Sequence, residues 1–258
     1  PAASVPPAVG RASAAPTAPR RTPRPLPACR YDDLPAAGDP DRDWATIVVD
    51  TIFRLPAGYV PPRLVSTARA GMEAGYEVIP EMIDDLRALH EASIRADAEV
   101  AVRWAYRSHA EQAAVFAMWS REASREEALR ISARPGHSEH QLGTAVDFRS
   151  ADSLTPPWEY PDWGRTRPGA WMARNAWRYG FVMSFPRGRE EESCYDHEPW
   201  HFRYVGREIA AAIEAAGVAP RRYLWELGRG EPAPPGSTPV PWLAPDRNPW
   251  IEAPSGAR

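Results

Sequence analysis

The sequence predicts one α+β domain, in which a small, mainly antiparallel sheet is flanked by helices, with proline-rich tails at both ends. The chain of 258 residues has an apolar fraction of 43%, which is enough to build one substantial core. Segments with strand periodicity and segments with helical spacing follow one another without the regular rhythm of βαβ units. Prolines concentrate near both ends, so we expect the core between them.

The two ends have the composition of tails. Residues 1–27 hold eight prolines, and prolines return after Gly228, so both stretches have too little apolar surface to offset the entropy of ordering. We therefore expect a Pro-rich N-terminal segment (1–39), a compact domain (40–228) and a Pro-rich C-terminal tail (229–258). Four apolar residues of that tail could dock on the domain surface: Trp242, Leu243, Trp250 and Ile251.

The first half of the domain predicts a helix, a strand and a second helix. Residues 80–97 begin with a proline and carry apolar residues at mostly three-to-four spacing, which is typical of an amphipathic helix. Residues 99–108 alternate apolar side chains on one face, which predicts a strand that ends at Arg107. Ser108 and Glu111 have the spacing of a capping box, so the second helix begins there.

The second half predicts the rest of the sheet and three more helices. The strands are "GTAVDF", "FVMSFP" and "WHFRYVG", and the helices are "PGAWMARNAWRYG", closed by Gly180, "REIAAAIEAAG" and "PRRYLWELG". Two long polar loops, 130–142 and 186–198, adjoin strands that carry histidines. Loops of this length usually hold functional sites.

Charge and composition exclude several classes of function. The net charge is −3 and the basic residues are scattered among acidic ones, so we expect neither nucleic acid nor anionic lipid as a partner. The chain has no lysine, which excludes mechanisms that need a lysine amine, such as Schiff bases and P-loop nucleotide hydrolysis. No run of 18 apolar residues is present, so we expect no transmembrane segment.

The two cysteines, Cys29 and Cys194, leave two alternatives open. One long-range disulfide would stabilise an exported protein by roughly 4 kcal/mol, and two free thiols are the other possibility. The chain starts at Pro1 without a charged-then-apolar leader. We expect an exported protein of the periplasm or cell envelope from which a signal peptide has been removed.

Two clusters of polar residues could hold a metal. His140 and Asp147 lie seven residues apart with Gly143 between them, where a turn would let both face one pocket. The stretch "HEPWH" adds Glu198 and His201 at the entry to a strand. Catalytic zinc needs three N or O ligands, an open fourth position and a nearby base, which predicts that His140, Asp147 and His201 bind zinc and that Glu198 is the base.

Each cluster alone has an ordinary structural explanation. A single histidine on a strand is more often a core residue than a ligand, and the aspartate before Phe148 could cap a turn. Two clusters of matching ligand type in one domain favour the metal site. His137 and His197 also have acceptable ligand spacing relative to His140 and His201, and they are the competing ligands.

The motifs resemble those of a known family. "SEHQLGTAVD" matches the Ser-x-His-(x6)-Asp signature and "EPWH" the Glu-x-x-His signature of LAS-type zinc peptidases, and the chain is similar to VanY-type D-alanyl-D-alanine carboxypeptidases. The similarity covers roughly residues 45–225. Its further blocks, in the same order, are "FRLPAGYVPPRLV", "AYRSHAEQ", "NAWRYGFV" and "EPWHFRYVG".

The resemblance implies a hedgehog/D,D-peptidase-like fold and a role for each site residue. His140, Asp147 and His201 would bind Zn²⁺, and Glu198 would take a proton from the attacking water and deliver it to the leaving amine. Arg107 would stabilise the developing oxyanion. Gln112 and Ser138 match positions that hydrogen-bond the peptide, and neither His137 nor His197 would bind the metal. We expect each of these two histidines at the rim of the site or behind its ligands, with an ordinary surface histidine as the alternative.

The function that the resemblance implies is a zinc-dependent D,D-carboxypeptidase that hydrolyses the terminal D-Ala-D-Ala bond of peptidoglycan stem peptides with metal-activated water. The alternatives are a related peptidoglycan endopeptidase and a non-catalytic cell-wall-binding module. We expect a monomer.

Cys194 departs from the family, since relatives commonly carry a small residue such as glycine in that loop. A disulfide to Cys29 would then fasten the N-terminal segment beside the catalytic loop. Two thiols in the denatured, unreduced protein would exclude this hypothesis.

Overall fold

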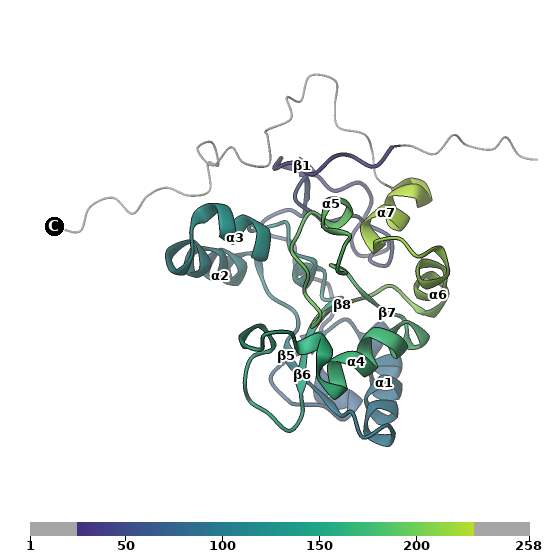
Figure 1. Ribbon diagram of the computed structural model, residues 1–258. Coiled ribbons are helices and arrows are strands. Elements are labelled where there is room, and N and C mark those ends of the chain that lie inside the picture. The colour runs from purple at the N-terminus through teal and green to yellow at the C-terminus, as the bar shows by residue number, and fades with distance from the viewer. Residues whose placement is uncertain (1–24, 230–258) are drawn as a thin grey trace, which may run out of the picture.

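The centre of the fold is a four-stranded antiparallel sheet. The computed structural model describes residues 25–229, and its sheet has the strand order β5-β6-β8-β7 (Figure 1). The strands are β5 (Val100–Trp104), β6 (Ala145–Ser150), β7 (Phe181–Met183) and β8 (His201–Tyr204). The predicted fold class, α+β with a small antiparallel sheet, is confirmed.

Alternate residues of these strands divide the sheet into two different faces. Side chains such as Val102, Phe148 and Phe202 enter the main core together with residues of α1 (Ile83–Arg95) and α4 (Arg167–Asn175). Because successive side chains of a strand point to opposite faces, Asp147, His201 and Arg203 lie on the other face. One face of the sheet therefore packs into the core and stabilises the domain, and the other face carries the polar residues.

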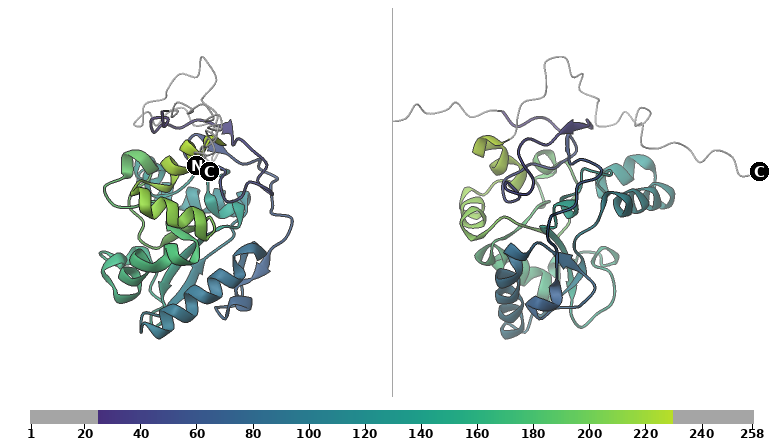
Figure 2. Two further views of the ribbon diagram at one scale, coloured as in Figure 1. Left: turned by 90° about the vertical axis from the view of Figure 1, so that its right-hand side faces the viewer. Right: turned by 180° about the vertical axis from the view of Figure 1, so that it is seen from behind.

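A helical hairpin projects on the side of the molecule away from α1 (Figures 1 and 2). It consists of α2 (His109–Glu122) and α3 (Arg125–Ile131). The capping box of Ser108 and Glu111 is present, as predicted. The sequence analysis missed α3, although Ser124 and Glu127 have the Ser-x-x-Glu spacing, and the Ser124 hydroxyl does accept the Glu127 amide.

Shorter elements complete the chain. The helices are α5 (Glu190–Ser193), α6 (Arg207–Ala216) and α7 (Pro220–Leu224), which a π-helical turn, Trp225–Arg229, extends. β1 (Leu34–Pro35) pairs in parallel with β2 (Phe53–Arg54), and β3 (Val65–Ser66) pairs antiparallel with β4 (Glu77–Val78). The 3-10 turns are Thr67–Ala70, Pro80–Met82, Glu139–Leu142 (η3), Pro157–Glu159, Trp163–Arg165 and Ala176–Tyr179.

The strand predicted over residues 99–108 is shorter than expected. The ladder between β5 and β6 is irregular between Val102 and Trp104, and β5 ends at Trp104. Beyond it, the Tyr106 amide donates to Glu77 and the Arg107 amide donates to His140. The chain thus leaves the sheet because carbonyls of β4 and η3 replace the ladder, and this exit carries Arg107 toward η3.

Residues 25–36, here called the strap, cross the domain beside α5 and α7. The Trp225 indole donates to the Pro25 carbonyl (3.0 Å), and the Tyr31 hydroxyl donates to the Leu129 carbonyl (3.2 Å). Although the sequence placed these residues in a tail, they contact the domain. The domain boundaries themselves stay predictions, and Trp242, Leu243, Trp250 and Ile251 lie outside the described residues.

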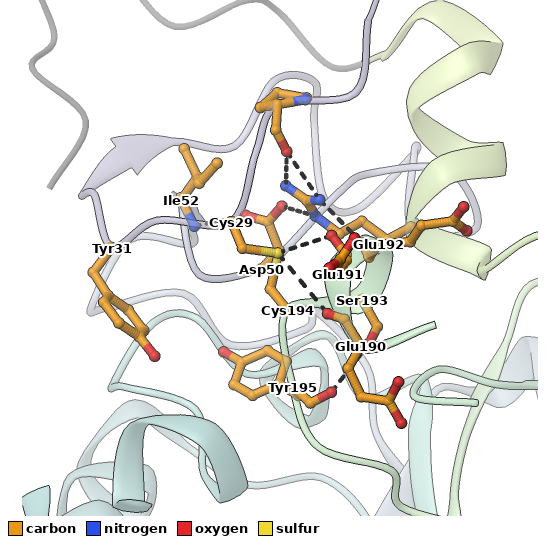
Figure 3. The surroundings of a disulfide bond; sticks show 12 residues. Cys29, Tyr31, Asp50, Ile52, Glu190, Glu191, Glu192, Ser193, Cys194 and Tyr195 are labelled. Carbon is orange, nitrogen blue, oxygen red and sulfur yellow. Dashed lines mark hydrogen bonds and ion pairs between the residues drawn. A yellow bond between two sulfur atoms is a disulfide. The ribbon is translucent and has the colours of Figure 1, made fainter. Parts of the chain in front are cut away.

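The disulfide hypothesis is confirmed in the structure. Cys29 of the strap is bonded to Cys194, with 5.3 Å between their Cα atoms (Figure 3). Cys194 follows α5 with a φ of 69°, the left-handed region that favours glycine. Next to the bridge, the Arg221 guanidinium binds the Asp50 carboxylate and the Pro27 carbonyl, so the strap has a second attachment.

Removing the bridge should lower the free energy of unfolding. Because the disulfide joins residues separated by 165 positions and so restricts the unfolded chain, we expect Cys29→Ala/Cys194→Ala to lose about 2–5 kcal/mol in urea denaturation. The matched variant Cys29→Ala/Cys194→Gly should be more stable than this by about 1 kcal/mol, since glycine accepts the left-handed backbone. Equal stability of the two variants would contradict the second expectation.

Candidate metal centre

The pairing of β6 with β8 brings two of the predicted ligands together. Asp147 and His201 are direct partners in the antiparallel register, so their side chains leave the same face at neighbouring positions. The Asp147 Oδ1 atom lies 2.9 Å from His201 Nδ1. Strand geometry alone thus joins residues that are 54 positions apart.

The third predicted ligand comes from η3. The Ser138 hydroxyl accepts the His140 amide (3.3 Å), and Gly143 ends the turn with a φ of 71°, which confirms the predicted glycine turn. His140 Nε2 then lies 3.3 Å from Asp147 Oδ2. His140, Asp147 and His201 are all buried, and each offers one ligand atom within 4.8 Å of the others.

Each histidine ring uses one nitrogen for a hydrogen bond on the side away from Asp147, so its other nitrogen can bind a metal. His140 Nδ1 donates to the Ala105 carbonyl (2.7 Å), which leaves the Nε2 lone pair toward Asp147. His201 Nε2 lies 3.0 Å from a carboxylate oxygen of Glu139, which leaves Nδ1 toward Asp147. Two imidazole nitrogens and one carboxylate converging in this way fit a divalent cation such as zinc.

The two histidines differ in their protonation. Burial lowers the pKa of His140. Burial also acts to lower the pKa of His201, but hydrogen bonds to Asp147 and Glu139 outweigh it and raise that pKa to about 10. Burial would raise the pKa of Asp147, yet the two histidines hold it well below its usual range. The carboxylate is therefore ionised at neutral pH.

Glu198 reaches the same cleft from the turn before β8. Its amide donates to the Phe185 carbonyl (3.2 Å) and its carbonyl accepts the His201 amide (3.2 Å), so its backbone is fixed next to the strand. Burial is the main cause that raises the pKa of its carboxyl to about 8. Among residues 25–229, no side-chain hydrogen bond contributes to that shift. The carboxyl of Glu198 can therefore gain and lose a proton near neutral pH.

Arg107 lines the cleft at the end of the segment that follows β5. Its guanidinium lies 5.3 Å from the centre of the Trp104 ring, and its Nε has no hydrogen-bond partner among the described residues. Burial lowers the pKa of Arg107, although Asp147 and Glu198 oppose this shift. The side chain therefore holds a positive charge beside the two carboxyl groups.

The cleft has a volume of about 530 Å³ and one polar end. At that end lie the three possible ligands, with Ser138, Glu139, Glu198 and Arg107. The rest of the wall is largely apolar and is formed by residues of α2 and by indole rings: Ala114, Val115, Met118, Trp119, Trp104, Trp158 and Trp200. Both long loops predicted from the sequence also contribute residues to the wall.

Gln112 does not line the cleft, in contrast with Ser138. Its side chain is buried on α2, and its Nε2 donates to the Ala133 carbonyl (2.6 Å). In this arrangement Gln112 supports the loop before η3. Its proposed contact with a peptide would need the side chain to leave that carbonyl.

His137 and His197 are not part of the ligand cluster within the described chain. His137 is 1% exposed, so the alternative of an ordinary surface histidine is wrong for it. Its ring contacts the Asp50 carbonyl (2.6 Å) and Asp33 of the strap (3.0 Å), which occupies both nitrogens. His197 is half-buried in the cleft wall, with Nδ1 on the Phe185 carbonyl (2.9 Å).

Sequence reasoning missed three residues behind the site: Glu139, Ser184 and Arg203. Glu139 contacts His201, Ser184 and Arg203. One signal was present, because Arg203 stands two positions after His201 and so shares its face of the sheet. An arginine on a strand between buried residues requires an acidic partner, but the sequence does not say which.

Comparisons with known proteins identify the family of the chain. Residues 76–207 match the family model described as VanY, D-alanyl-D-alanine carboxypeptidase. The carboxypeptidase-like protein YodJ of Bacillus subtilis (strain 168) is 31% identical over 202 residues, which are 76% of this chain and 71% of YodJ. A D-alanyl-D-alanine carboxypeptidase of Enterococcus faecalis is 38% identical over 90 residues, covering 35% of this chain and 31% of that protein.

Solved structures show the same fold. The LdcB LD-carboxypeptidase, described with its peptidoglycan recognition, has a TM-score of 0.60 and 28% identity, covering 71% of this chain and 86% of its own. A mutant of the vancomycin resistance D,D-pentapeptidase VanY in complex with Zn(II) has a TM-score of 0.58 and 28% identity. The match covers 70% of this chain and 99% of the VanY chain. VanYB in complex with D-alanine-D-alanine has a TM-score of 0.58 and 29% identity. The match covers 70% of this chain and 97% of the VanYB chain.

The affinity for zinc should depend on pH. Because the pKa of His201 is raised to about 10, its ring is protonated at neutral pH until a cation displaces the proton. Raising the pH from 6 to 8 should therefore strengthen zinc binding by about tenfold per pH unit. Competition with a chelator at several pH values measures this. An affinity that does not change with pH would contradict displacement of a proton by the metal.

Proposed function

The chain belongs to the VanY D-alanyl-D-alanine carboxypeptidase family, and on this premise we propose that it is a zinc-dependent D,D-carboxypeptidase that removes the terminal D-Ala of peptidoglycan stem peptides. One observation carries the proposal. Two imidazole nitrogens and a carboxylate converge at the polar end of a cleft that also holds Glu198 and Arg107.

His140, Asp147 and His201 would hold the zinc through Nε2, a carboxylate oxygen and Nδ1. When bound, zinc supplies Lewis-acid chemistry, which makes water acidic enough to attack a peptide bond near neutral pH and polarises the peptide carbonyl. The three ligands come from protein, as in catalytic sites that leave a fourth position open. The choice of zinc is supported by the similar VanY structure, which is a complex with Zn(II).

Glu198 would move the proton during hydrolysis. Its carboxyl has a pKa near 8 and lies in the cleft, so it can take a proton from the attacking water and give it to the amine of the leaving D-Ala. Glu139 is not suited to this role, because Arg203, Ser184 and His201 already bind its oxygens.

Arg107 would stabilise negative charge on the peptide. Arg107 is one of the residues that line the cleft, and its buried Nε has no hydrogen-bond partner among the described residues. A fixed positive charge at the position where the carbonyl oxygen becomes negative lowers the barrier more than one that must reorient. Ser138, which also lines the cleft, is placed to contact the peptide beside it.

Two other peptidases remain to be separated from the proposed one. The fold is as similar to the LdcB LD-carboxypeptidase as to the VanY D,D-pentapeptidase, with TM-scores of 0.60 and 0.58. A cell-wall endopeptidase would share the metal ligands. A non-catalytic binding module is disfavoured by Glu198, because a purely structural zinc closes its coordination and needs no free base.

We further propose that the protein acts outside the cytoplasm, where peptidoglycan lies. The Cys29–Cys194 disulfide supports this, because such bonds persist in oxidising compartments. Within residues 25–229, no helix is long and apolar enough to cross a membrane. That the protein is a monomer stays a prediction.

Replacing the base should separate metal binding from hydrolysis. We expect Glu198→Gln to keep one zinc per chain and to lose about 100- to 10,000-fold in kcat, because the amide cannot accept the proton. Metal analysis and a D-Ala release assay measure the two properties. Activity at the wild-type level would contradict the assigned role, and His140→Ala is the matched variant that should lose the zinc.

The charge of Arg107 should be needed for the chemical step. Arg107→Gln should lower kcat by about 100- to 1,000-fold, because no positive charge then meets the oxyanion. Arg107→Lys keeps the charge but not the planar donors, so its kcat should fall less than that of Arg107→Gln. A change in KM alone would contradict a role at the oxyanion and would point to a role in peptide binding.

The products of defined muropeptides should identify the reaction. We expect the pentapeptide to lose one alanine, as seen by mass spectrometry, and a chelator to stop the loss. Release of alanine from the tetrapeptide alone would identify an L,D-carboxypeptidase. Cleavage of cross-linked dimers with an intact pentapeptide would identify an endopeptidase.

A further inference from the structure

Two buried charges behind the metal centre have no part in the proposed reaction. Arg203 is 1% exposed and stands on β8, two residues after His201. Glu139 immediately precedes the ligand His140 on η3. The two side chains form an ion pair of 3.1 Å, and Glu139 also contacts His201.

Arg203 is anchored by the body of the domain. Its Nη2 donates to the carbonyls of Trp44 (2.9 Å) and Ile47 (2.8 Å), and its Nη1 donates to Glu139 Oε1. Because both carbonyls belong to backbone that packs on the sheet, the guanidinium has little freedom to turn. Glu139 Oε1 is thereby held at a fixed place.

The second oxygen of Glu139 faces the metal ligand. Oε2 accepts the Ser184 hydroxyl (2.6 Å) and lies 3.0 Å from His201 Nε2. An ionised carboxylate can only accept, so the ring must place its proton on Nε2. The ion pair with Arg203 (3.1 Å) and the hydrogen bond from Ser184 (2.6 Å) both favour the ionised carboxylate.

We propose that Glu139, held by Arg203 and Ser184, is a positioning residue that fixes the tautomer and the direction of the His201 ring, so that the Nδ1 lone pair points at the metal. This inference rests on the proposed zinc site. The carboxylate also makes the ring a stronger base, which strengthens its bond to a metal. The effect of Glu139 and Arg203 passes through the His201 ring.

The substitution Glu139→Gln tests the direction of the hydrogen bond. The amide oxygen can still accept from Arg203, while its NH2 group now faces His201 and offers a donor where the ring also has one. The proton of the ring is then driven to Nδ1, which is the ligand atom. We expect zinc to bind about 10- to 100-fold more weakly, measured by competition with a chelator.

A matched variant separates this effect from the loss of any buried ion pair. Glu73 also pairs with an arginine on the sheet, Arg149, and also accepts a backbone amide, that of Val102. Glu73→Gln should leave the affinity for zinc unchanged. A loss of affinity equal to that of Glu139→Gln would overturn the positioning role, because it would then reflect general destabilisation.

The wild-type protein supplies a second test that does not depend on how a variant folds. In the zinc-loaded protein, the ¹⁵N shifts and couplings of the histidine rings report which nitrogen carries the proton. We expect His201 to be protonated at Nε2 and His140 at Nδ1. A His201 ring protonated at Nδ1 in the zinc-loaded protein would overturn the proposal.

The outcome also distinguishes this inference from the proposed function. If the wild-type protein neither binds zinc nor releases D-Ala, the proposed function fails first. If the wild-type protein binds zinc and releases D-Ala, but Glu139→Gln binds zinc equally well with the same ring tautomer, only the positioning role of Glu139 fails.

Discussion

The register between β6 and β8 is the constraint on which the rest of the site depends. It sets Asp147 opposite His201, and the same pairing sets Ala145 opposite Arg203 and Val146 opposite Phe202. A slip of one residue would turn the ligands into the core and the apolar side chains into the cleft. The large apolar residues of the other face, such as Phe148 and Phe202, oppose that slip because they are fully buried against α1 and α4. The packing that stabilises the domain therefore also holds the metal site.

A buried polar face needs partners that come from elsewhere in the chain. η3 supplies His140 to the cluster and Glu139 to Arg203, while the strap supplies Asp33 to His137 and Arg134. The disulfide fixes the strap to the loop that leads into Glu198. Each of these contacts joins segments distant in sequence, so the site is assembled only when the whole domain is folded. This arrangement would hold the three ligands rigidly for a bound metal.

The sequence predicted the parts of this structure that depend on local signals. The capping box at Ser108, the turn at Gly143 and the alternation of apolar side chains that predicts β5 were readable because each involves neighbours in the chain. The ligand set came from two motifs and a family resemblance, and the structure brings those three residues together. What could not be read depends on long-range contacts. Gln112 turns to Ala133, His137 is enclosed by the strap, and Glu139 meets Arg203 across 64 residues.

X-ray absorption at the zinc edge of the zinc-loaded protein tests the central claim most directly, because it counts the ligands of the metal. The account predicts one zinc per chain with two imidazole rings, at Zn–N distances of about 2.0–2.1 Å, and oxygen atoms in the remaining positions. A third imidazole would contradict it, since His137 or His197 would then bind the metal and the pairing of Asp147 with His201 would not define the site.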